Sequence, residues 1–191
     1  GFIAPTFQWQ ESVNNGLSWK DIPEANTTGY LFNQTAVGTY KYRLSAAEGA
    51  NIFISNCRVA SNAVTITIHS LPMVTASNNS PVCENANLQL VATGGIGFNW
   101  TGPSGFSSTL ANPSFTALPI ASGEYNVLVT DSFGCSNTVS TTAFINPKPT
   151  AVVSANQNFC EGDTITLTAS GGNVYVWSPA AGLSDINTAN P

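Results

Sequence analysis

The chain has 191 residues, a formal net charge of −5 and only 8% charged residues. Its hydrophobic content of 42% excludes a disordered chain, and its 16 glycines and 11 prolines, set among β-branched and aromatic residues, favour short strands joined by turns. The few dispersed basic residues exclude a nucleic-acid partner, and the lack of an apolar run of transmembrane length excludes insertion into a membrane.

Residues 1–71 are predicted to form the back half of a β-sandwich repeat. Asn15-Gly16 is a strong turn signal and predicts a hairpin between Trp9 and Trp19. Cys57 lies farther along the chain from Tyr40 than Cys135 lies from Tyr125 in the next repeat. Two later strands are expected in this segment, one around Tyr40 and one in the alternating run at 61–68.

Residues 72–148 are predicted to form one complete repeat. Leu88, Leu90 and Ala92 alternate with polar neighbours, which is the period of a half-buried strand, and Trp100 is expected to fill the core. A set of about seven short strands around a tryptophan predicts an all-β fold of the immunoglobulin-like sandwich type. The strands are expected at 73–77, 87–93, 97–101 and 124–130, with a last strand after a turn at 131–134.

Residues 149–191 repeat the opening of that pattern. Residues recur in pairs 77 positions apart, which indicates an array of small domains. The pairs are Pro72 and Pro149, Cys83 and Cys160, Leu90 and Leu167, Gly94 and Gly171, and Trp100 and Trp177. We therefore predict part of a repeat at 1–71, a complete repeat at 72–148 and the front of a third at 149–191. The predicted core aromatics are Trp9, Tyr40, Trp100, Tyr125 and Trp177.

Each repeat has one cysteine near its beginning and one near its last hairpin. Only Cys83 and Cys135 share a complete repeat, so we predict a disulfide between them, which would contribute about 4 kcal/mol and place the protein outside the reducing cytosol. Cys57 and Cys160 would then pair with residues outside this chain. The alternative is unpaired thiols, because these two positions lie at opposite ends of an ordinary immunoglobulin sandwich.

Few residues are candidates for catalysis, metal binding or contact with a ligand. The single histidine, His69, is expected at a joint between repeats, the acidic residues lack metal-ligand spacing and no Cys-x-x-Cys pair occurs. We therefore predict no enzyme, metal or cofactor. An aromatic ring can stack on a sugar, however. The candidates for contact with a polysaccharide are Trp19, Tyr30, Phe32 and Phe106, with packing as the alternative for each.

Five short segments carry a family resemblance: Val82-Cys83-Glu84, Tyr125-Asn126-Val127, Gly134-Cys135, Trp177-Ser178-Pro179 and Gly182-Leu183-Ser184. They resemble the immunoglobulin-like and PKD-like repeats of very large Bacteroidetes surface proteins, including gliding-motility adhesins and other substrates of type IX secretion. The resemblance implies a spacer or stalk in a long extracellular protein attached to the outer membrane, active in adhesion or gliding. Asp163-Thr164-Ile165 also resembles the short acceptor sequence for O-glycans in this bacterial group, which makes Thr164 a candidate glycan site, with a chance match as the alternative.

The partners expected on this basis are neighbouring repeats of the same polypeptide and surface polysaccharide. Self-association into filaments is also expected, because a surface with so little charge offers little electrostatic repulsion. The alternative function is a carbohydrate-binding accessory module of a secreted multimodular enzyme.

Overall fold

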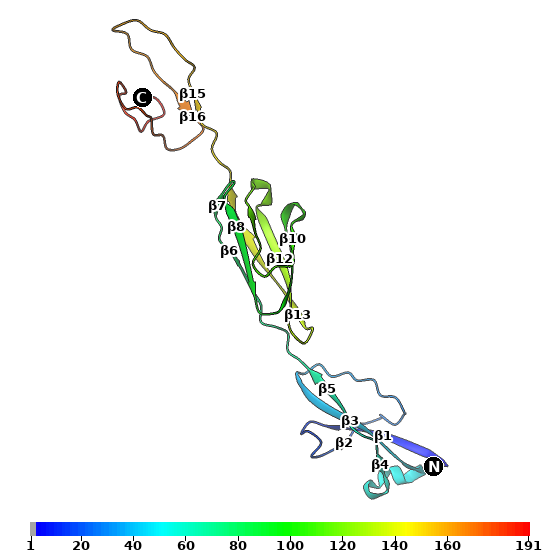
Figure 1. Cartoon of the computed structure of the whole chain (residues 1–191). Helices are drawn as coiled ribbons and strands as arrows, with labels where there is room; N and C mark the ends of the chain where they lie inside the picture. The colour runs from blue at the N-terminus through cyan, green and yellow to red at the C-terminus, as the bar shows by residue number, and fades with distance from the viewer. Residues whose placement is uncertain (1–2) are drawn as a thin grey trace. The chain divides into compact units, whose positions relative to one another are not determined.

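The computed structural model describes residues 3–191, and its regular elements are strands and short 3-10 helices (Figure 1). The prediction of an all-β fold is therefore confirmed. Among the described residues, no helix is long and apolar enough to span a bilayer. The chain divides into two compact units, one running to Met73 with the turns at 94–96 and 130–137, the other holding 74–93, 97–129 and 138–191.

A two-sheet sandwich is formed between residues 74 and 146. One sheet has the strand order β11-β8-β6 and the other β10-β9-β12-β13, while β7 and β14 form a parallel pair. This is an immunoglobulin-like arrangement. The bounds are β6 (Thr75–Asn78), β7 (Val82–Cys83), β8 (Asn87–Thr93), β9 (Gly97–Thr101), β10 (Ser107–Ser108), β11 (Ser114–Thr116), β12 (Gly123–Thr130), β13 (Ser136–Ala143) and β14 (Ile145–Asn146), with 3-10 helices η3 (Pro103–Gly105) and η4 (Pro119–Ala121).

The core of this sandwich comes from alternation along its strands. Leu88 and Leu90 of β8 and Val127 of β12 are fully buried, and they pack in one cluster with Trp100 of β9. Burying one such side chain stabilises the fold by about 1.5–3 kcal/mol. The alternation of apolar and polar residues along β8 therefore turns Leu88 and Leu90 into the cluster that contains Trp100.

A buried tyrosine closes one corner of the sandwich. Tyr125 Oη donates to the Ala121 carbonyl, four residues upstream, at 2.7 Å. Tyr40 repeats this bond in the first segment, where its hydroxyl donates to Ala36 O at 3.0 Å. This is the tyrosine corner found in many immunoglobulin-like sandwiches. It shows that the two segments turn into their tyrosine-bearing strands in the same way.

Residues 5–68 form a five-stranded sheet with β3 at its centre. Between β3 and β4 the chain makes two 3-10 helices, and the first of these begins at Gly49, whose φ of 45° favours glycine. The bounds are β1 (Pro5–Ser12), β2 (Lys20–Asp21), β3 (Gly38–Glu48), η1 (Gly49–Phe53), η2 (Ser55–Cys57), β4 (Val59–Ala60) and β5 (Val64–Ile68).

The two faces of this sheet differ in chemistry. One carries Trp9, Tyr40 and Tyr42 and is called here the aromatic face. The other carries Gln10 and Ser45, both buried, and is called the polar face. Because successive side chains of a strand point to opposite faces, the register of β1 against β3 fixes this separation.

The predicted turn at Asn15-Gly16 is present, with left-handed φ values of 61° and 91°. The β1–β2 ladder, however, closes at Glu11 and Lys20 rather than next to the turn. Ser12 Oγ instead accepts a hydrogen bond from Gly16 N at 2.9 Å. A side-chain oxygen thus takes the place of a ladder partner, and the loop is longer than a two-residue hairpin.

Residues 149–191 contain one short antiparallel ladder between β15 (Val152–Val153) and β16 (Ala169–Ser170). Val153 pairs with Ala169. In the complete sandwich Ala76 pairs with Ala92, and both partners lie 77 residues earlier. The strand register therefore recurs with the same spacing as the sequence.

Two of the predicted core tryptophans are less buried than expected. Trp100 has no exposed surface, whereas Trp9 and Trp177 are half-buried. Each is nevertheless tied by its indole to a backbone carbonyl. The reason for the difference is that no second sheet covers either residue within the described part of the chain. The bonds run from Trp9 Nε1 to Thr27 O (3.1 Å), from Trp100 Nε1 to Leu110 O (3.1 Å) and from Trp177 Nε1 to Thr188 O (2.8 Å).

The predicted Cys83–Cys135 disulfide is wrong, since both cysteines are free. Cys83 pairs with Asn146 in the β7–β14 ladder, and Cys135 directly precedes β13. Eleven residues of extended chain separate Cys135 from Asn146 along β13 and β14, a span of about 35 Å. A disulfide needs Cα atoms within about 7 Å. Cys57 and Cys160 are free and exposed.

Candidate functional site

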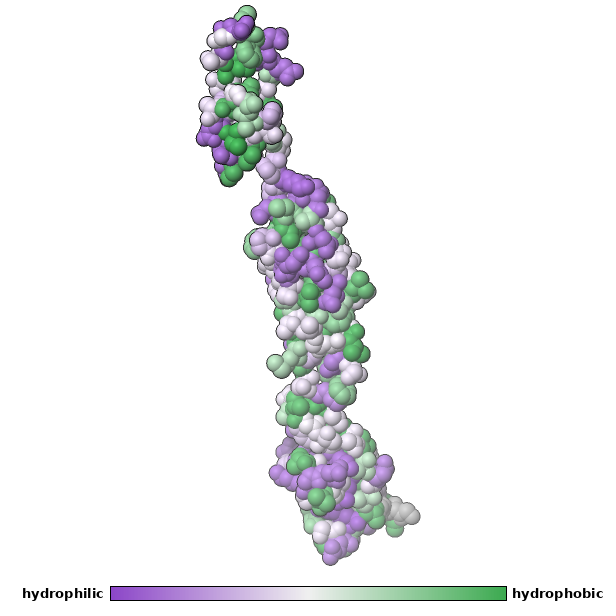
Figure 2. Space-filling model, turned by 60° about the vertical axis from the view of Figure 1, so that its left-hand side comes forward, coloured by the Kyte–Doolittle hydropathy of each residue, from purple (hydrophilic) through white to green (hydrophobic). Residues whose placement is uncertain are grey.

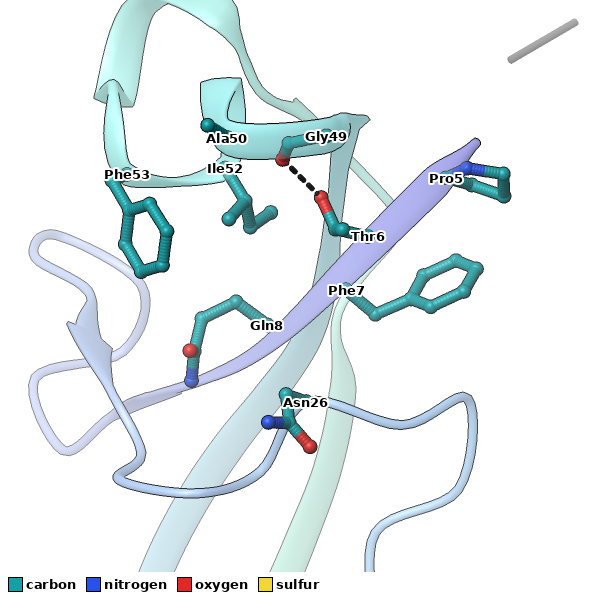
Figure 3. A pocket seen from close by; sticks show the side chains of 9 residues that line it. All are labelled: Pro5, Thr6, Phe7, Gln8, Asn26, Gly49, Ala50, Ile52 and Phe53. Carbon is teal, nitrogen blue, oxygen red and sulfur yellow. Dashed lines mark hydrogen bonds between the residues drawn. The ribbon is translucent and has the colours of Figure 1, made fainter. Parts of the chain in front are cut away.

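A surface groove of about 550 Å³ lies beside β1 in the first segment (Figure 3). Thr6 and Gln8 project into it from β1, and Ile52 and Phe53 form a wall contributed by η1. Asn26, from the loop after β2, lies at its lower edge in this view. Three stretches distant in sequence therefore meet at one groove.

Hydrogen bonds hold the walls of the groove in place. Thr6 Oγ1 donates to Gly49 O at 2.7 Å, which ties β1 to the start of η1. Gln8 Nε2 donates to Ile22 O at 2.6 Å, which ties β1 to the loop after β2. Ile52 is buried, while Phe53 is 83% exposed. The groove therefore has a fixed floor and an aromatic ring open to solvent.

The chemistry of the groove suits a neutral ligand. None of its nine lining residues carries an ionisable side chain. The Phe53 ring offers an apolar surface, and the Asn26 and Gln8 amides supply polar groups that can bond hydroxyls. Apolar walls with a few polar groups are typical of small-molecule sites.

A polar network on the polar face anchors the η1–η2 stretch. Gln10, which is 7% exposed, donates to Asp21 Oδ1 at 2.7 Å and accepts from Arg43 Nε at 2.8 Å. Arg58 binds both Asp21 oxygens, at 2.7 and 2.9 Å. Arg58 also donates to the carbonyl of Ile52. The Arg58–Asp21 pair thus joins β2 to the wall of the groove.

The charge state of this network follows from its contacts. The hydrogen bond from Arg58 lowers the pKa of the Asp21 carboxyl below its usual value, and the Gln10 bond acts in the same direction against the opposing effect of burial. Burial raises the pKa of the Tyr42 and Tyr125 phenols. Asp21 is therefore ionised and both phenols are neutral near pH 7.

The four aromatic residues predicted to contact a ligand take part in packing. The Arg43 guanidinium carbon lies 4.2 Å from the centre of the Trp19 ring, a cation–π contact. Tyr30 and Phe32 lie against Tyr42 on the aromatic face, with ring centroids 6.0 and 5.4 Å away.

The fourth, Phe106, packs against Phe115 and Tyr125 in the complete sandwich, with ring centroids 4.7 and 5.3 Å away.

The groove at Phe53 was not predicted from the sequence. The signal that could have found it is the longer stretch between Tyr40 and Cys57, which contains η1.

The remaining residues that the sequence suggested for glycosylation or metal binding do not gather at one site. Thr164 is exposed in the third segment. No cluster of three or more His, Cys, Asp or Glu side chains that could hold a metal occurs between residues 3 and 191.

Comparison with known proteins adds two similarities. Residues 1–70 match the family described as "Domain of unknown function (DUF8696)". The chain is also similar to a solved structure titled "Structure of amphioxus IgVJ-C2 molecule", at 13% identity and a TM-score of 0.36, over 75% of this chain and 91% of that one. No curated protein matches the chain.

Proposed function

We propose that this chain is a structural and adhesive segment of a long extracellular protein, built from repeats that act as a spacer or stalk. In this proposal residues 1–71, 72–148 and 149–191 belong to three successive repeats. The support is the recurrence of one set of anchors along the chain, namely an indole bonded to a carbonyl, a tyrosine corner and one strand register. A stalk needs many copies of one stable module.

The observation that carries the proposal is the parallel β7–β14 pair. Val82 N donates to Phe144 O at 3.1 Å, and Glu84 N donates to Asn146 O at 2.8 Å. These strands lie near the beginning and the end of the complete sandwich. Tension applied along the polypeptide pulls two parallel neighbours in opposite directions, so it shears both bonds together rather than opening them one after the other. A module closed in this way resists pulling.

The resemblance to Bacteroidetes repeats supports the location and the role in this proposal. We infer from it display at the cell surface after type IX secretion, attachment to the outer membrane and a part in adhesion or gliding. An extracellular stalk needs stability without a disulfide in the complete repeat, and the buried core around Trp100 supplies that stability.

Single-molecule force spectroscopy on the full chain, tethered at its two ends, tests the mechanical role. Glu84→Pro removes the backbone N–H that bonds Asn146 O, and it should lower the unfolding force of the complete sandwich. Glu84→Ala keeps that N–H but, like Glu84→Pro, loses the hydrogen bond that Lys148 N donates to Glu84 Oε2 at 3.1 Å, so it is the matched control and should unfold at a higher force than Glu84→Pro. Equal forces for Glu84→Pro and wild type would reject the proposal that this pair carries tension.

A second candidate function, binding of a neutral polysaccharide, is favoured by the exposed Phe53 ring in its uncharged groove. On a glycan array, Phe53→Ala should abolish any binding shown by the wild-type chain. Phe144→Ala is the matched control, because Phe144 is also exposed, at 61%, and lies outside the groove. No binding by the wild-type chain, or equal loss with Phe144→Ala, would reject this candidate.

A further inference from the structure

The linker that leaves the complete sandwich, Pro147-Lys148-Pro149-Thr150, has no large apolar side chain. Figure 2 accordingly shows hydrophilic and pale surface at this point of the chain. Burial of hydrophobic surface therefore cannot keep the linker in one conformation. The two prolines restrict the backbone at their own positions, but Lys148 and Thr150 need other contacts if they are to be ordered.

Glu84 makes two contacts with the chain that leaves the sandwich. Its backbone N donates to Asn146 O at 2.8 Å, and its side-chain Oε2 accepts a hydrogen bond from Lys148 N at 3.1 Å. The second bond is charge-assisted, and such bonds are stronger than those between neutral groups. The hydrogen bonding between β7 and β14 is therefore continued by one bond beyond the last residue of β14 and onto the linker.

A tight turn directs the Glu84 side chain toward this linker. Asn85, the next residue, has a left-handed φ of 66°, and Ala86 N donates to Cys83 O at 3.0 Å. The same turn occurs 77 residues later in the third segment, with Glu161 in the place of Glu84. There the φ of Gly162 is 92°, and Asp163 N donates to Cys160 O at 3.1 Å. Because left-handed backbone is uncommon, the turn with its glutamate is a specific feature that both segments share.

The far end of the linker is restricted by a glycine. A Cβ on Gly171 would collide with the carbonyl oxygen of Thr150, and Gly171 has a left-handed φ of 94°. The Thr150 backbone thus passes so close to Gly171 that no side chain fits between them. The linker is therefore contacted at Lys148 by Glu84 and at Thr150 by Gly171, with only Pro149 between these two points.

The linker that enters the complete sandwich also has contacts at both of its ends. The His69 ring stacks on the Phe133 ring, with centroids 3.8 Å apart and the planes 10° from parallel. Asn137 Nδ2 donates to Pro72 O at 3.2 Å. Phe133 and Asn137 belong to the turn at 130–137, which lies in the same compact unit as residues 69–73. This turn therefore restricts the incoming linker.

We propose that the complete sandwich orders the linkers on both of its sides, so that neither linker is a free hinge. Glu84 is the positioning residue for the outgoing linker, and Phe133 is the positioning residue for the incoming one. The inference rests on the proposed spacer role and deepens it, because a stalk keeps its ends apart only if its joints resist bending. Semi-rigid, proline-containing linkers suit that role.

Nuclear spin relaxation of the ¹⁵N-labelled full chain tests the outgoing linker. The order parameter of the Lys148 N–H should be about 0.85 in the wild type, as in rigid backbone, and should fall below about 0.6 in Glu84→Ala. Glu84→Gln is the matched control, because its amide oxygen still accepts a hydrogen bond, and it should stay close to the wild type. Unchanged order parameters in β8 would show that the sandwich of each variant is folded. A mobile Lys148 in the wild type, or equal values for the two variants, would overturn the proposal.

The same measurement tests the incoming linker. Phe133→Ala should lower the order parameters of the Ser70 and Leu71 N–H groups, because it removes the ring on which His69 stacks. Phe144→Ala is the control, since Phe144 is 61% exposed against 66% for Phe133, and it should leave both values unchanged. Equal values in the two variants would overturn this part of the proposal. No force is applied in these experiments, so a low unfolding force in the pulling experiment would reject the mechanical role of the β7–β14 pair and not the order of the linkers.

Discussion

At the residue scale, the aromatic anchors explain both what the sequence predicted and what it missed. Trp100 and Tyr125 are buried because strands β9 and β12 place them between two sheets. Alternating hydrophobicity was sufficient to predict this. The same pattern did not predict that Trp9 and Trp177 would stay half-buried, since periodicity reports which way a side chain points and not whether a second sheet faces it.

Gly102 is expected to be intolerant of a side chain. A Cβ at this position would lie 2.6 Å from Tyr125 Cε1, too close for contact with a buried ring. Gly102→Ala should lower the free energy of unfolding by about 1–3 kcal/mol, measured by urea denaturation. Gly29→Ala is the control, because its Cβ would meet no heavy atom within 4 Å, and it should change stability by less than about 0.5 kcal/mol. Equal effects of the two substitutions would show that the Tyr125 contact is not the cause.

The Asp21–Arg58 pair should make stability depend on acid. The pKa of Asp21 is lowered in the folded state, so its contribution is present above the pKa of the unfolded chain and is lost as the pH falls through the folded value. Because the Asp21 side chain is 43% exposed although that of Arg58 is only 13% exposed, Asp21→Asn should cost about 1 kcal/mol at pH 7. The difference from wild type should shrink at acidic pH, as measured by urea midpoints across an acid titration.

The control for this titration is Glu24→Gln, which changes an exposed carboxylate in the same segment. Its free energy of unfolding at pH 7 should lie within about 0.5 kcal/mol of the wild-type value, because the side chain is exposed. If Asp21→Asn stays parallel to the wild type down to the lowest pH, the ion pair with Arg58 does not stabilise the fold.

At the element scale, the sequence predicted strand positions better than it predicted strand partners. The expected strands at 87–93, 97–101 and 124–130 coincide with β8, β9 and β12 to within a residue. The disulfide prediction failed because regular spacing of cysteines along the chain does not report which end of a sandwich each one occupies. β7 and the groove wall at η1 were missed because both depend on contacts with distant parts of the chain.

Because the complete sandwich has no disulfide, reducing agent should not affect its stability. Thermal melts of the full chain with and without dithiothreitol should agree to within about 2 °C, and the double substitution Cys83→Ser with Cys135→Ser should behave alike. Thiol titration of the unfolded chain gives an independent readout, with all four cysteines expected to react. A drop of about 15 °C or more on reduction would instead indicate a bridge of the strength first predicted from the sequence.

At the scale of the whole molecule, the segments differ in how completely each forms a core. The cluster around Trp100 draws on residues between Val74 and Ile145. The third segment has a single two-residue ladder and leaves Val174 and Val176 exposed. The middle segment is therefore the one that contains all the surfaces it must bury.

Isolated fragments of the chain should show this difference between the middle and the third segment. A fragment of residues 72–148 should melt cooperatively and give a dispersed NMR spectrum, because its core needs no other part of the chain. A fragment of residues 149–191 should give neither, since so short a ladder cannot offset the entropy of ordering the chain. The expectation fails if the longer fragment is unfolded in isolation.

The β7–β14 pair also sets when a module can be completed during synthesis. Tyr125 finds its partner four residues upstream, so that corner can close as soon as the strand appears. β7 must wait for β14, the last strand of the sandwich to be made. Until residue 146 has been synthesised, the β7–β14 pair of the nascent domain cannot form. A chain pulled during this interval would unfold at the incomplete module, while the completed modules before it would stay folded.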